Sequence, residues 1–252
     1  MKIAGVETFS HEQPAPFLYL HGVPTDGDDW LPFLARTGGY APDLPGFGRS
    51  GKPPHFDYSI PGYARWLREY LDAVGLDGRF SLVAHDWGSV GLALAQEIPE
   101  RIERLVLIDA VPLLPGYRWH RAARIWRTPL AGEMAMGFTF KRTLLRGGVP
   151  AELADRAYER FDHGTQRAIL KLYRSAGSDV LAAAGARLGA ITAPALEVWG
   201  SEDAYLPSEF AHLYGERLGG EARVELVEGA GHWPWVGHAG VIEMVTEFLL
   251  GP

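Results

Sequence analysis

Short apolar runs alternate along the chain with segments in which apolar residues recur at helical spacing. The apolar runs predict strands at residues 17–20, 80–83, 105–108, 195–199 and 224–227. The helical spacing predicts helices at residues 63–74, 89–98, 207–218 and 241–250. Strands that alternate with helices in this way are typical of an α/β fold, with a mostly parallel central sheet and helices on both faces.

Residues 112–190 break this alternation. The segment is rich in Arg, Trp, Tyr and Ala at helical spacing and contains no clear strand. Gly and Pro gather near both of its ends, at 112–116 and 191–194, where hinges are expected. We therefore predict a helical cap, or lid, at 112–190, inserted into one core domain formed by residues 1–111 and 191–252.

Composition narrows the classes of partner. The chain has 252 residues, 47% of them apolar, which is enough for one large core. A net charge of -7 and the lack of a basic stripe argue against nucleic acid. No cysteine is present, so disulfides and thiolate metal sites are excluded. No run approaches the roughly 18 apolar residues of a membrane span, which predicts a cytoplasmic protein with no membrane partner.

The segment Ala84-His85-Asp86-Trp87-Gly88 lies between a predicted strand and a predicted helix. A sharp strand-to-helix turn, or nucleophile elbow, requires small residues two positions before and two after its tip, and Ala84 and Gly88 meet this requirement. Asp86 stands at the tip. A carboxylate there favours attack on a saturated carbon with a leaving group, because the product is an ordinary ester that water can cleave. Epoxides and alkyl halides are such substrates.

After Asp86, two further candidate residues follow predicted strands, first an acid and then a histidine. Nucleophile, acid and histidine are expected in this order along a chain that has such an elbow. Asp203 follows the strand at 195–199 within the sequence Gly200-Ser201-Glu202-Asp203, and His232 follows the last strand within Gly229-Ala230-Gly231-His232. We predict that His232 activates water as a general base and that Asp203 orients it. Asp109, at the end of the strand at 105–108, is the alternative acid.

His21-Gly22-Val23-Pro24 follows the first predicted strand. The backbone N–H groups of Val23 and Trp87 are therefore predicted to form an oxyanion hole for the charge that develops when the ester is hydrolysed. His21 and His85 are interpreted as structural hydrogen-bonding residues.

The stretch Gly46-Phe47-Gly48-Arg49-Ser50-Gly51 matches the dinucleotide pattern G-x-G-x-x-G. That pattern binds pyrophosphate only where a helix begins at the glycines, and the following Lys52-Pro53-Pro54 prevents such a helix. We therefore predict a surface loop here, and no cofactor and no metal site in the chain.

These segments together resemble the α/β-hydrolases of the epoxide hydrolase and haloalkane dehalogenase group. The resemblance rests on His21 to Pro24, Asp43 to Ser50, His85 to Gly88, Gly200 to Pro207 and Gly231 to Trp233, and it covers nearly the whole core. It implies the α/β-hydrolase fold and hydrolysis through a covalent Asp86 ester.

The resemblance also implies different leaving-group donors in the two branches. Haloalkane dehalogenases hold the halide between the Trp after the nucleophile, here Trp87, and an Asn or a cap Trp. Val23 occupies the Asn position and the chain contains no Asn, so Trp119 or Trp126 would have to supply the second N–H.

Epoxide hydrolases instead use cap tyrosines to protonate the ring oxygen, and Leu172-Tyr173-Arg174 matches one such element. The first family tyrosine has no clear counterpart, and Tyr117 or Tyr158 could replace it. Tyr117 and Phe138, together with Trp119 and Trp126, complete the predicted substrate-binding set.

We predict an epoxide hydrolase with Asp86, His232, Asp203 and Tyr173 as catalytic residues, and a haloalkane dehalogenase as the alternative. A ligand-binding receptor of the same fold is a third reading, and a serine esterase is a fourth because neither Ser81 nor Ser89 lies at the elbow tip. The predicted partners are a small apolar substrate and water, and the predicted assembly is a monomer or homodimer.

Overall fold

The computed structural model describes residues 1–251 and contains a seven-stranded sheet. The strand order is β3-β5-β4-β6-β7-β8-β9, and every neighbouring pair is parallel except β3 with β5. The strands are β3 (Ser10–Gln13), β4 (Phe17–Leu20), β5 (Gly39–Pro42), β6 (Phe80–Asp86), β7 (Ile102–Ala110), β8 (Ala195–Gly200) and β9 (Ala222–Val227). A small hairpin of β1 (Lys2–Ile3) and β2 (Val6–Glu7) precedes them. The predicted α/β class with a mostly parallel sheet is confirmed.

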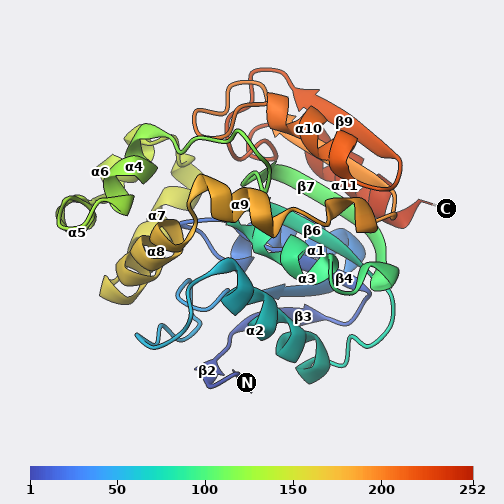
Figure 1. The fold of residues 1–252 in the computed structure, drawn as a ribbon, viewed down its shortest axis with the longest axis horizontal. Coiled ribbons are helices and arrows are strands. Elements are labelled where there is room, and N and C mark those ends of the chain that lie inside the picture. The colour runs from blue at the N-terminus through green and yellow to red at the C-terminus, as the bar shows by residue number, and fades with distance from the viewer. Residues whose placement is uncertain (252) are drawn as a thin grey trace.

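Helices cover both faces of this sheet (Figure 1). Alternate residues of β4 enter two different apolar clusters, Leu18 and Leu20 on one side and Phe17 and Tyr19 on the other. The first cluster is completed by α2 (Ile60–Ala73), α3 (Gly91–Ala95) and α10 (Glu209–Arg217), and the second by α1 (Leu31–Thr37) and α11 (Gly240–Leu250). Period-two alternation along a strand is what a sheet buried on both faces requires.

The segment between β7 and β8 is helical. It contains α4 (Arg121–Arg127), α5 (Ala131–Gly137), α6 (Lys141–Arg146), α7 (Ala151–Glu159), α8 (His163–Ser175), α9 (Ser178–Ala184) and the 3₁₀ turn η4 (Leu188–Ala190). We call α4–α9 the helical insertion. All of these helices fall inside the predicted 112–190, and Figure 1 shows α4, α5 and α6 at the edge of the molecule, away from the sheet.

Some elements have no signal in the apolar pattern. β3 has the polar sequence Ser-His-Glu-Gln and lies at the sheet edge, so it needs no apolar run. β5 begins at Gly39 and ends at Pro42, two residues that normally indicate turns. α1, preceded by the 3₁₀ turn η1 (Gly27–Trp30), spans only seven residues.

Two helix predictions needed correction at their boundaries. The predicted helix at 89–98 is a 3₁₀ turn, η2 (Trp87–Val90), followed by the short α3, and a second 3₁₀ turn, η3 (Pro99–Arg101), precedes β7. The glycine-rich stretch 46–51 forms no helix, but its predicted place at the surface is wrong: Phe47 and Ser50 are almost fully buried, because the loop folds back and hydrogen-bonds to Asp43. The next helix, α2, begins at Ile60 rather than at residue 63, with Ser59 as its N-cap. A helix that could hold pyrophosphate is therefore absent from that loop.

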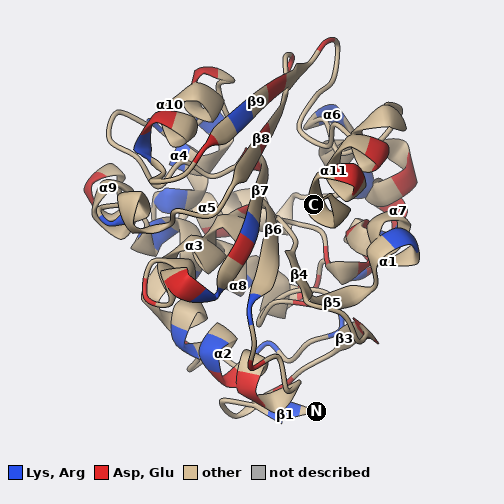
Figure 2. Ribbon diagram, turned by 90° about the vertical axis from the view of Figure 1, so that its right-hand side faces the viewer, with Lys and Arg blue, Asp and Glu red and all other residues tan. Residues whose placement is uncertain are grey.

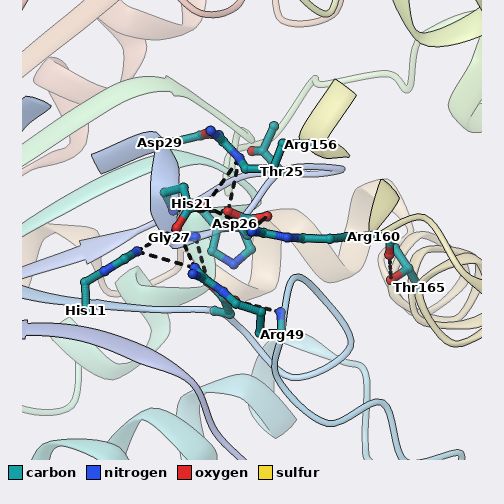
Figure 3. A network of polar contacts seen from close by, with 12 residues as sticks. His11, His21, Thr25, Asp26, Gly27, Asp29, Arg49, Arg156, Arg160 and Thr165 are labelled. Atoms are coloured by element: carbon teal, nitrogen blue, oxygen red, sulfur yellow. Dashed lines mark hydrogen bonds and ion pairs between the residues drawn. The ribbon is translucent and has the colours of Figure 1, made fainter. Parts of the chain in front are cut away.

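Buried ion pairs join the helical insertion to the core (Figure 3). Arg156 of α7 contacts Asp29 and lies 3.4 Å from Asp26. Arg160, just after α7, contacts Asp26 and lies 3.1 Å from Asp28. The three aspartates belong to one loop that follows β4. Because Asp26 and Asp29 are almost fully buried, losing an arginine would leave a carboxylate without its counter-charge.

Candidate active site

The elbow has the predicted backbone geometry. β6 ends at Asp86, which has a φ of 46°, and η2 begins at Trp87. A side chain at Gly88 would overlap the carbonyl oxygen of Leu20, and a Cβ at Gly22 would lie 2.6 Å from the Asp86 Cβ. Gly22 therefore allows the loop after β4 to pack directly against the strained Asp86, and Gly88 allows η2 to pack against the end of β4.

Backbone donors hold the Asp86 carboxylate. The N–H of Val23 donates to Asp86 Oδ2 at 2.8 Å, and the N–H of Trp87 also hydrogen-bonds to this carboxylate. Burial raises the pKa of Asp86 above its ordinary value of 3.8, whereas His232 and both N–H groups oppose that increase. The two N–H groups predicted for an oxyanion hole thus lie against the carboxylate itself.

His232 connects two carboxylates. Its Nδ1 lies 2.8 Å from Asp203 Oδ2, and its Nε2 lies 3.7 Å from Asp86 Oδ1. Burial lowers the pKa of His232, but the charge and hydrogen bond of Asp203 outweigh burial, so the pKa is raised above 6.5. Burial alone would raise the pKa of Asp203. The charge and hydrogen bond of His232, together with the other hydrogen-bond donors, outweigh burial and lower this pKa to about 2.

Asp203 is fixed from its other side as well. Its Oδ1 accepts the N–H groups of Tyr205 at 2.7 Å and Leu206 at 3.1 Å. Asp109, the alternative acid, is fully buried and accepts the Gly200 N–H at 3.0 Å. It also shares a side-chain hydrogen bond with Asp203, and burial followed by the Asp203 charge raises the pKa of Asp109 well above 3.8.

A hydrogen bond between two carboxyl groups requires one proton, and these opposite pKa shifts place it on Asp109. Asp109 therefore donates to Asp203, and Asp203 is the carboxylate that contacts His232. One ligand atom each from Asp109, Asp203 and His232 lies within 4.8 Å of the others. Because these atoms satisfy one another, the cluster is explained by hydrogen bonding within the chain.

His21 and His85 support the backbone around this site. His85 Nε2 donates to the carbonyl oxygen of His232 at 2.8 Å, so it holds the loop that carries the imidazole. His21 Nδ1 contacts the carbonyl oxygen of Gly22 at 2.8 Å, and its Nε2 accepts the N–H of Leu44 at 2.9 Å. Burial lowers the pKa of each histidine, which keeps both neutral.

A cavity of about 280 Å³ opens beside Asp86 and His232. Core residues form its floor, and apolar residues of α4, α5, α6 and α8 form most of its wall, including Ile125, Met136, Leu144 and Ile169. This volume fits a small molecule, and the lining favours an apolar one.

The predicted insertion residues divide into two groups. Trp119, Trp126 and Tyr173 line the cavity. Tyr117 and Phe138 do not: Tyr117 is buried behind the wall, and Phe138 is 69% exposed on the outside. Helical spacing cannot distinguish the inner side of a short helix from its outer side, which explains the placement of Phe138.

The side chains that could donate a hydrogen bond to a leaving group differ in whether their N–H or O–H is already engaged. The Trp119 indole donates to the carbonyl oxygen of Ala176 at 2.8 Å, so its N–H is already used. The Trp87 indole N–H is buried and has no acceptor of hydrogen-bond geometry among the described residues. The Tyr173 ring packs edge-on against the Trp87 ring, with centroids 5.1 Å apart. Burial raises the pKa of Tyr173 well above 10, and the Trp87 side chain opposes only part of this increase. A neutral phenol therefore lies beside the Trp87 indole N–H, close enough for a weak interaction between them to lower the Tyr173 pKa in part.

Four aromatic residues that line the cavity were missed in the sequence: His120, Phe161, Tyr205 and Trp233. His120 caps α4 through its Nδ1, which accepts the N–H of Ala123, and burial lowers its pKa to about 4. Tyr205 lies 5.2 Å from the His232 ring and 4.9 Å from the His120 ring, and burial raises its pKa to about 12. The signal for Tyr205 was its position two residues after Asp203.

The match to a known family decides what the chain is. The model of the α/β-hydrolase fold family matches residues 15–239, which include both halves of the core and the insertion between them. This chain belongs to the α/β-hydrolase family. The fold, the elbow and the order of Asp86, Asp203 and His232 along this α/β-hydrolase agree with the match.

Individual relatives of this α/β-hydrolase include haloalkane dehalogenases. The one from Mycolicibacterium paratuberculosis is 31% identical over 218 residues, covering 76% of this chain and 68% of that enzyme. The one from Mycobacterium marinum is 34% identical over 166 residues, so the match spans only about half of that enzyme (54%). A haloalkane dehalogenase structure from Bradyrhizobium elkani superposes with a TM-score of 0.82 at 26% identity, covering 100% of this chain and 96% of that one.

These likenesses place the chain in the α/β-hydrolase family, within the haloalkane dehalogenase-like group. They do not confirm the epoxide hydrolase prediction, and they favour the alternative.

Proposed function

We propose that this hydrolase displaces halide from a small haloalkane through a covalent ester on Asp86. In the first step an Asp86 oxygen attacks the saturated carbon, the carbon–halogen bond breaks, and halide leaves with the bonding electron pair. The position of the Asp86 carboxylate carries this proposal, because it is held by two N–H donors at the floor of an apolar cavity.

In the second step water attacks the carbonyl carbon of the ester. His232 removes the proton from that water, and Asp203 stabilises the imidazolium that results. The N–H groups of Val23 and Trp87 stabilise the oxyanion. Collapse of the tetrahedral intermediate releases the alcohol and restores the Asp86 carboxylate. The overall change converts haloalkane and water to alcohol, halide and a proton.

The leaving halide needs hydrogen-bond donors, and Trp87 and Tyr173 are proposed for that role. A buried N–H without an acceptor carries an energetic cost, which an anion bound during the reaction would remove. The Tyr173 hydroxyl replaces Trp119, whose N–H is engaged by Ala176. The relatives named above support halide as the leaving group.

Epoxide hydrolysis is the second candidate because of Tyr173 alone. An epoxide oxygen leaves as a basic alkoxide that stays attached to the substrate, so it needs a proton donor. Tyr173 is a neutral phenol on the cavity wall. It would donate this proton to the ring oxygen while Asp86 attacks the ring carbon.

The covalent step is tested by replacing His232 with Ala, because alkylation of Asp86 needs no base whereas hydrolysis of the ester does. Incubation with 1-bromobutane should raise the intact mass by one butyl group, and peptide mapping should locate it at Asp86. The double variant His232→Ala/Asp86→Asn is the matched control and should stay unmodified. Absence of the adduct despite bromide release by the wild type would contradict a covalent ester.

The leaving group is tested by measuring bromide release from 1-bromobutane and diol formation from styrene oxide side by side. We expect Trp87→Phe to reduce bromide release and Tyr173→Phe to reduce diol formation, the latter by roughly 10–10⁴-fold. Turnover of styrene oxide without any bromide release would reverse the order of the two candidates. Turnover of neither compound, with folding intact, would favour a ligand-binding receptor.

A further inference from the structure

The outer edge of the insertion, formed by α4, α5 and α6, exposes large apolar side chains. Leu130, Met134 and Phe138 are 78%, 65% and 69% exposed, and they follow one another at intervals of four residues along one face of α5 and its caps. Phe140 and Leu145 add to this apolar surface. Twelve large apolar side chains are exposed among the described residues, and these five, which include the three most exposed, all fall within residues 130–145, so the surface calls for an explanation.

The same edge is strongly basic although the chain is acidic. Residues 118–149 contain seven Lys or Arg and one Glu, whereas the whole chain has a net charge of -7. Glu133 pairs with Arg174 of α8, and Lys141 contacts Asp155 of α7. Arg118, Arg121, Arg124, Arg142 and Arg146 have no ion pair among the described residues. Figure 2 views the opposite end of the molecule, where basic and acidic segments are mixed along α2 and α10.

Basic and apolar side chains also share helix faces here. Arg142, Leu145 and Arg146 of α6 lie at spacings of three and four residues, and Arg121 and Arg124 are exposed three residues apart on α4. Helices with exposed apolar residues among unpaired arginines are suited to the interface of an anionic bilayer. None of the described helices is long and apolar enough to cross a membrane, so such contact would remain at the surface.

We propose that α4, α5 and α6 bind the surface of an anionic phospholipid membrane. Leu130, Met134 and Phe138 would enter the headgroup region, and the unpaired arginines would contact lipid phosphates. A second copy of the chain fits less well, because a two-fold contact would bring this basic surface against itself. The sequence prediction of no membrane partner considered spanning segments only, and this proposal revises it.

The proposed membrane-binding surface lies on the same helices that form the wall of the cavity. The inner sides of the same three helices line the cavity through residues such as Ile125, Met136 and Thr143. An apolar substrate concentrates in lipid, so a surface-bound enzyme would meet it at higher local concentration. The membrane contact itself does not depend on which leaving group the enzyme removes.

The test is flotation of the full chain with vesicles of phosphatidylglycerol and phosphatidylcholine in equal parts, against vesicles of phosphatidylcholine alone. We expect binding only to the anionic vesicles, and weaker binding as salt is raised. Arg142→Gln/Arg146→Gln should lower the partition coefficient roughly 25-fold, about fivefold for each charge. Met134→Ser/Phe138→Ser should lower it about tenfold or more.

Matched controls use residues outside this surface. Arg187→Gln/Arg217→Gln removes two arginines without ion pairs among the described residues, and Leu226→Ser removes an apolar side chain that is 46% exposed on β9. These controls should bind within twofold of the wild type, and all variants should keep the wild-type melting temperature. The proposal is overturned by absence of binding, or by equal effects of surface and control variants. It is also overturned if ultracentrifugation without lipid shows a dimer that Met134→Ser/Phe138→Ser dissociates.

Discussion

The carboxyl edge of the sheet and the helical insertion above it position their residues by different means. At the sheet edge, backbone N–H groups, a strained φ and buried hydrogen bonds fix Asp86, Asp203 and His232. In the insertion, aromatic packing holds Trp126 and Tyr173, with ring centroids 5.0 Å apart. In the function proposed above, the first region sets the reaction class through backbone geometry. The second sets the leaving group and the substrate through side-chain packing.

The largest expected effect comes from the sheet edge. Asp86→Asn should reduce turnover by about 10⁴-fold or more, because an amide is a poor nucleophile while its shape preserves the contact with Val23. Steady-state halide or diol release measures this loss. Trp126→Phe, in the insertion, is the comparison and should retain turnover within about tenfold while altering KM. Equal losses in both variants would contradict the division between the two regions.

Replacing Asp203 should alter both the rate and its pH dependence. The base form of His232 is required, so activity of the wild type should fall as pH decreases through the raised pKa of His232, above 6.5. Asp203→Asn removes the main cause of that raised pKa, so the acid limb should move to lower pH while the maximal rate falls by roughly 10²–10⁴-fold. A pH–rate profile measures both. An unchanged acid limb would show that another group controls it.

Asp109 should have a smaller effect that acts through Asp203. Asp109→Asn keeps a donor for Asp203 and an acceptor for the Gly200 N–H, so it should retain activity within a few-fold. Asp109→Leu loses both groups and should reduce the rate about tenfold, with a shift of the His232 limb. Comparing the two variants by rate and pH profile separates hydrogen bonding from packing. Equal behaviour of Asn and Leu would exclude a positioning role.

The smallest effect on chemistry is expected where the insertion joins the core. Arg156→Gln should lower the free energy of unfolding by about 2–4 kcal/mol, because Asp26 and Asp29 both lose a counter-charge, and burial, which already raises the pKa of Asp29 to about 7, then forces a proton onto it. Turnover should change little. Thermal unfolding measures the loss, and Arg65→Gln, which removes an exposed ion pair with Asp57, should cost less than about 1 kcal/mol. If Arg156→Gln and Arg65→Gln lower the free energy of unfolding by similar amounts, the buried ion pairs between the insertion and the core have no special role in stability.

The sequence predicted the sheet edge well because spacing and backbone chemistry are visible in it. The small residues around Asp86 and the glycines before His232 indicate directly what backbone geometry each side chain requires. The insertion was harder, because Phe138 and Trp126 look alike as aromatic residues on short helices. Only packing shows that one lies outside and the other lines the cavity. The proton held by Asp109 could not be predicted either, since it depends on a contact between the end of β7 and the loop after β8, at residues 109 and 203, which are 94 positions apart.

The ion pairs of Figure 3 have a consequence for protein engineering. Arg156 and Arg160 are separated by four positions, one helical turn, and their acceptors all come from a single core loop. The interface therefore consists of two arginines and one aspartate-containing loop, and both short segments can be transferred together to another protein. A chimera that keeps α7, α8 and this loop but takes α4–α6 from another hydrolase would retain its docking contacts. Substrate range could then be exchanged as a module, with the reacting groups left untouched.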